Sequence, residues 1–137
     1  HMTVIDHPVV RLQPSSGEGP TTVRTLAEFD LEASGDVYLR SISGVLTSND
    51  DGEAGSIKLL NDETMVGFED LTKLTDGQFT FSFPSRLTLV PGKTHFRIVT
   101  DSTHDRGDTL QIELRSIITN LADMTTVVRW HPVVCGQ

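Results

Sequence analysis

The stretch from Phe79 to Leu114 constrains the fold of this chain more than any other part of the sequence. It contains three runs rich in β-branched and aromatic residues, which are separated by a Pro-Gly turn and by an acidic, glycine-containing loop. In the first run, Phe79, Phe81 and Phe83 alternate with polar residues, so they share one face of a strand. This pattern predicts an all-β chain that folds as an antiparallel β-sandwich of two sheets.

The rest of the chain follows the same alternation. Over residues 21–33, apolar side chains alternate with Glu28, Asp30 and Glu32, and this period of two favours a strand over a helix. A first edge strand is expected within residues 3–13. Turn signals recur along the chain and predict about seven to nine strands. Further strands are expected over residues 37–47, 56–60, 64–68, 78–83 with a continuation over 87–89, 94–100, 109–119 and 125–130.

Two segments depart from simple alternation. In the run over residues 37–47, the apolar face shifts between Leu39 and Ile42, which predicts a bulge near Ser41 or a bend at Gly44. Residues 69–77 carry two spaced leucines that fit either a single helical turn or a short edge strand. We therefore expect an irregular segment there.

The predicted core lies on the inward face of these strands. The Phe-rich strand is expected to break at Pro84, and Val90-Pro91-Gly92-Lys93 is typical of a type II turn in which glycine takes a positive φ. The residues predicted to form the core are Ala27, Phe29, Leu31, Val37, Leu39, Ile57, Leu59, Phe79, Phe81, Phe83, Phe96, Ile98, Leu110, Ile112 and Leu114.

The length fits one domain, because 137 residues and 15.0 kDa allow a single core. His1-Met2 reads as a cloning remnant. We expect residues 1–20 to hold this remnant, an edge strand and a flexible loop, residues 21–130 to form the sandwich, and residues 131–137 to form a C-terminal tail.

The charge excludes two classes of partner. Eleven basic residues against 19 acidic ones give a net charge of -8, which repels both nucleic acid and anionic lipid. The sequence has neither an apolar run long enough to span a bilayer nor a signal-peptide core.

Cys135, the single cysteine, cannot form an internal disulfide. It is either an incidental thiol or the site of an intermolecular bridge or of an attachment.

Three phrases of the sequence resemble modular Ig-like β-sandwich domains of bacterial cell-surface and S-layer-like proteins. They are FDLEASGDVYL, LTLVPGKTHFRI and GDTLQIEL. The matching residues of the first phrase are Phe29, Ala33, Gly35, Asp36, Val37 and Leu39. Those of the second are Leu87, Leu89, Gly92, Thr94 and Ile98. Those of the third are Gly107, Asp108, Thr109, Leu110, Ile112 and Leu114.

This resemblance covers most of residues 23–128. It implies that the all-β chain is an Ig-like antiparallel β-sandwich of two sheets, with an extracellular or cell-surface location and a structural or adhesive role without catalysis. The implied partners are other copies of the chain or neighbouring surface domains, and self-assembly through exposed strand edges fits such a role. The resemblance transfers no catalytic residue.

Two acidic loops raise the question of a calcium site. Calcium binds six to eight oxygen ligands, several of them carboxylates, and it is the one cofactor that the sequence suggests. The simpler interpretation is that Asp, Asn and Gly form the turns. Neither loop follows the EF-hand pattern. The candidate ligands are Asp50, Asp51 and Glu53 of the first loop and Asp101, Asp105 and Asp108 of the second.

Other motifs favour a non-enzymatic protein. No G-x-S-x-G nucleophile motif is present, and the histidines lack zinc-site spacing, so they are expected to be surface imidazoles. Arg106-Gly107-Asp108 matches an integrin-type tripeptide, although its Gly-Asp pair is also explained as the turn that precedes the next strand.

The alternative function is a carbohydrate- or ligand-binding module, in which Tyr38 and Trp130 are the candidate sugar platforms.

Adding calcium while following the melting temperature separates the two interpretations of the acidic loops. If the loops share an ion, millimolar calcium raises the melting temperature, because a ligand that binds only the folded state stabilises it. Asp105→Asn should then remove the increase without changing the melting temperature in the absence of calcium. An unchanged melting temperature of the original chain contradicts the calcium site.

Overall fold

The structure is a computed structural model that describes residues 2–7, 24–33, 37–48, 55–100, 109–120, 123–129 and 133–134. This part of the chain contains ten β-strands and one short 3-10 helix, which confirms the all-β prediction. The ten strands exceed the seven to nine that were expected, because the two-residue strand β10 is too short to be recognised by alternation. The elements are β1 (Met2–His7), β2 (Arg24–Ala33), β3 (Val37–Ser48), β4 (Ser56–Asn61), β5 (Thr64–Asp70), η1 (Leu71–Lys73), β6 (Gln78–Leu89), β7 (Gly92–Thr100), β8 (Thr109–Thr119), β9 (Asp123–Arg129) and β10 (Val133–Val134).

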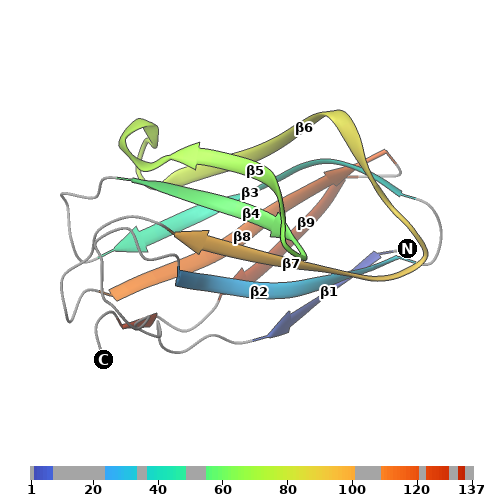
Figure 1. Ribbon diagram of the computed structural model, residues 1–137, viewed down its shortest axis with the longest axis horizontal. Coiled ribbons are helices and arrows are strands. Elements are labelled where there is room, and N and C mark those ends of the chain that lie inside the picture. Colours follow the sequence, from blue (N-terminus) through green and yellow to red (C-terminus); the bar gives the residue numbers. More distant parts are fainter. Residues whose placement is uncertain are drawn as a thin grey trace.

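The strands form two antiparallel sheets, as predicted for a sandwich. The first sheet has the order β1-β2-β7-β4-β5, and the second has the order β10-β8-β3-β6, with β9 also paired to β8. Figure 1 shows the two sheets as two layers. Most links between consecutive described strands cross from one layer to the other, whereas β1–β2, β4–β5 and β8–β9 are antiparallel pairs within a layer.

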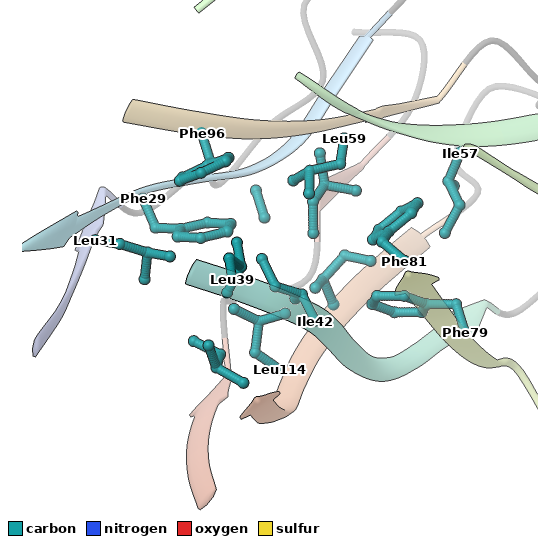
Figure 2. Close-up of a cluster of buried hydrophobic side chains, with 14 of the residues drawn as sticks. Phe29, Leu31, Leu39, Ile42, Ile57, Leu59, Phe79, Phe81, Phe96 and Leu114 are labelled. Carbon is teal, nitrogen blue, oxygen red and sulfur yellow. The ribbon is translucent and has the colours of Figure 1, made fainter. Parts of the chain in front are cut away.

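The core lies between the two sheets, and every residue predicted for it is buried. Phe29 of β2 stacks on Phe96 of β7, with ring centroids 5.6 Å apart. Phe79 and Phe81 of β6 pack against each other at 5.4 Å. Figure 2 shows these two ring pairs within one cluster of aliphatic side chains. Burying each such ring stabilises the fold by about 1.5–3 kcal/mol. Further buried members of the cluster are Leu26, Ala33, Ile42, Leu46, Leu71, Leu89 and Ile117.

The predicted irregularity of β3 is confirmed in both of its pairings. The register with β6 and with β8 shifts between Leu39 and Ser41, and the register with β8 shifts again between Ser43 and Gly44. At Gly44, a Cβ atom would overlap the carbonyl oxygen of Glu113 and approach the Phe79 ring to 3.0 Å. Only glycine lets β8 approach β3 this closely.

The expected break at Pro84 is not found, because β6 runs unbroken from Gln78 to Leu89. Only its pairing is interrupted, since β3 pairs with β6 up to Ser82 and again from Leu87. β6 is the edge strand of its sheet, and proline, which has no N–H to donate, is tolerated at edges and bulges.

The positive φ predicted for Gly92 is confirmed. Gly92, the first residue of β7, has φ +107°, in the left-handed region that glycine favours. Of the two structures that fit residues 69–77, the helical turn is found: it is η1, where buried Leu71 joins the core and Asp70 caps the turn. No helix in the described ranges is both long and apolar enough to cross a membrane.

Replacing Gly44 with alanine should lower the free energy of unfolding by about 1–3 kcal/mol, because the added methyl group overpacks the contact between β3 and β8. Urea denaturation measures this change. The neighbouring Ser43→Ala is the control, and we expect it to stay within about 0.5 kcal/mol of the original chain. Equal stability of the two variants would contradict the close approach.

Candidate functional site

All six predicted calcium ligands lie outside the described residues: Asp50, Asp51, Glu53, Asp101, Asp105 and Asp108. The strand ends that flank the two loops are described. β3 ends at Ser48 and β4 begins at Ser56, while β7 ends at Thr100 and β8 begins at Thr109. Figure 1 shows these four strand ends at the same end of the sandwich. Arg106, Gly107, Trp130 and Cys135 also lie outside the described residues.

The described residues carry a different polar cluster, on the outer face of the first sheet. It consists of Glu28 and Asp30 of β2 and His95 of β7, and we name it the His95 cluster. The strand register pairs Asp30 with His95. Nδ1 of His95 lies 2.7 Å from Oδ1 of Asp30, and Nε2 lies 3.0 Å from Oε1 of Glu28. The imidazole therefore bridges two carboxylates of the neighbouring strand.

The two contacts use both nitrogens of the ring. A neutral imidazole donates from one nitrogen only, so a doubly protonated ring completes both hydrogen bonds to ionised carboxylates. The side chain of Asp30 is 15% exposed, while that of His95 is 33% exposed. Partial burial strengthens the Asp30 contact relative to an open surface pair.

Arg97 extends the polar contacts along the outer face of β7. It donates through Nη1 to the Thr25 hydroxyl at 3.2 Å and through Nη2 to the Glu63 carboxylate at 3.2 Å. These bonds connect β7 with β2 on one side and with the β4–β5 hairpin on the other. Glu63 is 87% exposed, so the ion pair contributes only about 0–1 kcal/mol.

The contacts on this outer face hold neighbouring strands together. Within the ranges that the structure describes, no group of three or more His, Cys, Asp or Glu residues is placed to hold a metal ion. The sequence predicted a surface imidazole at His95 and missed its two carboxylate partners. The sequence does not specify how β2 aligns with β7, and it is this register that places Asp30 beside His95.

A second feature is the outer edge of the same sheet, formed by β5. Met65 and Phe68 are 54% and 53% exposed on this strand. At its end, Asp70 accepts hydrogen bonds from the hydroxyl of Thr72 at 2.7 Å and from the backbone N–H of Thr72 at 2.9 Å. The hydroxyl bond, followed by the backbone bond, lowers the pKa of Asp70 below its ordinary value. The carboxylate is therefore ionised at neutral pH.

Replacing Asp30 with asparagine should lower the free energy of unfolding by about 0.5–1.5 kcal/mol, because it removes a charge-assisted hydrogen bond while keeping the shape of the side chain. Thermal or urea denaturation at neutral pH measures the loss. Glu32→Gln, on the same face of the same strand, is the matched control and should change stability by less than about 0.5 kcal/mol. If both variants behave alike, the His95 cluster does not stabilise the sheet.

Comparison with known proteins was made for the whole chain. No protein-family model matches it, and no curated protein matches it either. The proposals below therefore depend on the fold and on the outer face and edge of the first sheet.

Proposed function

We propose that the protein is a non-catalytic structural or adhesive module of a prokaryotic surface protein, built as an Ig-like sandwich. The observation that carries this proposal is the path of the chain. Met2 of β1 pairs with Ala33 at the end of β2, whereas Val133 of β10 pairs with Leu110 near the start of β8. In Figure 1 the dark blue strand β1 begins at one end of the long axis, and the dark red strand β10 lies toward the other end.

Such a path suits a module in a linear array. When the first and last described strands lie at opposite ends, a neighbouring domain at either end extends the molecule along its length and leaves the outer faces of both sheets open. Strand links that cross between the layers also support an Ig-like arrangement. The net charge of -8 favours solubility and keeps such a module away from anionic surfaces.

Surface labelling of the source cells tests this proposal. An antibody raised against the chain should label intact cells, and brief treatment of those cells with protease should remove the label. An antibody against a cytosolic protein is the control and should label only permeabilised cells. If the chain is labelled only after permeabilisation, the surface role is wrong.

A glycan array tests the binding-module alternative on the same protein. We expect no strong signal, because the structural role needs no sugar site. A strong signal that Trp130→Ala abolishes would replace the structural role with carbohydrate binding. Phe68→Ala is the matched aromatic control for that experiment, because Phe68 is exposed but is not a candidate sugar platform.

A further inference from the structure

The β5 strand is an open edge of the first sheet. In the described part of the chain β5 pairs with one strand only, β4. Its other side therefore presents backbone N–H and C=O groups without a ladder partner. Such an edge is a template for one more strand.

Two exposed apolar side chains stand beside this open edge. Met65 pairs with Leu60 and Phe68 pairs with Lys58, and a bulge between these two pairs keeps both side chains on the outer face of the sheet. The intervening Val66 packs against the core instead. More than half of each side chain is in water although β5 is held firmly by β4. A further strand on this edge would place its own side chains against Met65 and Phe68.

The charges at the two ends of β5 are acidic. Glu63 lies before the strand, and Glu69 and Asp70 lie at its end. The hydrogen bonds from Thr72 keep Asp70 ionised. Glu63 is 87% exposed, so its ion pair with Arg97 is weak. An apolar middle is therefore flanked by acidic side chains at both ends of one strand edge.

These charges favour a different partner over a second copy of the chain. If two copies paired through β5 with Met65 opposite Phe68, an antiparallel two-fold arrangement would set Glu63 opposite the second copy's Asp70. Symmetry repeats this like-charge pair at the other end. Each such pair costs about 0.2–1 kcal/mol, whereas a basic residue at the same place would be attracted.

We propose that the β5 edge binds an extended segment of another protein that is apolar in its middle and basic at both ends. The segment adds as a sixth strand, so backbone hydrogen bonds supply affinity and the side chains at Met65, Phe68 and the acidic ends supply selectivity. This proposal does not depend on the surface role, because the edge has the same chemistry wherever the protein acts.

The test uses two synthetic peptides on the intact chain. The first is Lys-Thr-Val-Thr-Val-Thr-Val-Thr-Lys, and the second carries Glu in place of both Lys residues. Binding of the lysine peptide should slow amide hydrogen exchange in residues 64–70 and should weaken as salt is added. We expect its Kd to be about tenfold lower than that of the glutamate peptide, since reversing two end charges changes several cross-strand pairs.

Variants show whether the β5 edge is the binding surface. Phe68→Lys and Met65→Lys each place a like charge beside the incoming peptide and should raise its Kd about tenfold or more. Val90→Lys is the matched control, because Val90 is also an exposed apolar residue but lies between β6 and β7. The Val90→Lys variant should bind the lysine peptide with the same Kd as the original chain. Melting temperatures of all three variants report whether they are folded.

Four results would overturn the proposal. They are equal binding of the two peptides, no binding of the lysine peptide, slowed exchange in strands other than β5, and a concentration-dependent dimer at neutral pH that Phe68→Lys abolishes. The last result would assign the edge to a second copy of the chain.

Discussion

Burial of phenylalanine rings between the two sheets is the interaction on which the rest of this structure depends. The stacked pair Phe29 and Phe96 belongs to the first sheet, and Phe79 and Phe81 belong to the second. Because these rings occupy alternate positions on their strands, burying them turns every other side chain outward. The His95 cluster is a consequence of this constraint, since the strands that bury Phe29 and Phe96 must expose their polar neighbours on the opposite face.

Alternation explains why the core could be predicted and the polar cluster could not. The inward face of a strand is readable from its own residues, so Phe29 and Phe96 were assigned to the core without knowledge of their partners. The contact of Asp30 with His95 depends on how β2 aligns with β7, and a shift of one residue would separate them. Nothing local in either strand specifies this register. The acidic loops proposed to bind calcium lie outside the described residues, and that hypothesis remains a prediction.

The bulges show where local patterns fail. The bulge in β3 was predictable because its apolar residues change face between Leu39 and Ile42. The bulge in β2 was not, because Ala27 continues a perfect alternation while Leu26 beside it is also buried. The register shift between Thr25 and Ala27 places two consecutive side chains inside. At Pro84 the error was the opposite one: a break was predicted, but β6 continues, because an edge strand tolerates a proline that would break a central strand.

The acidic ends of β5 reconcile two opposing requirements of an open strand edge. An unprotected edge with Met65 and Phe68 beside it would favour pairing between identical chains, and natural sheets oppose this with charge and with bulges. β5 has both, with a bulge near Val66 and with Glu63 and Asp70 at its ends. Because specificity is a difference between affinities, the charges that oppose the chain's own edge favour a segment of opposite charge. Protection against self-pairing and selection of a basic partner therefore follow from the same residues.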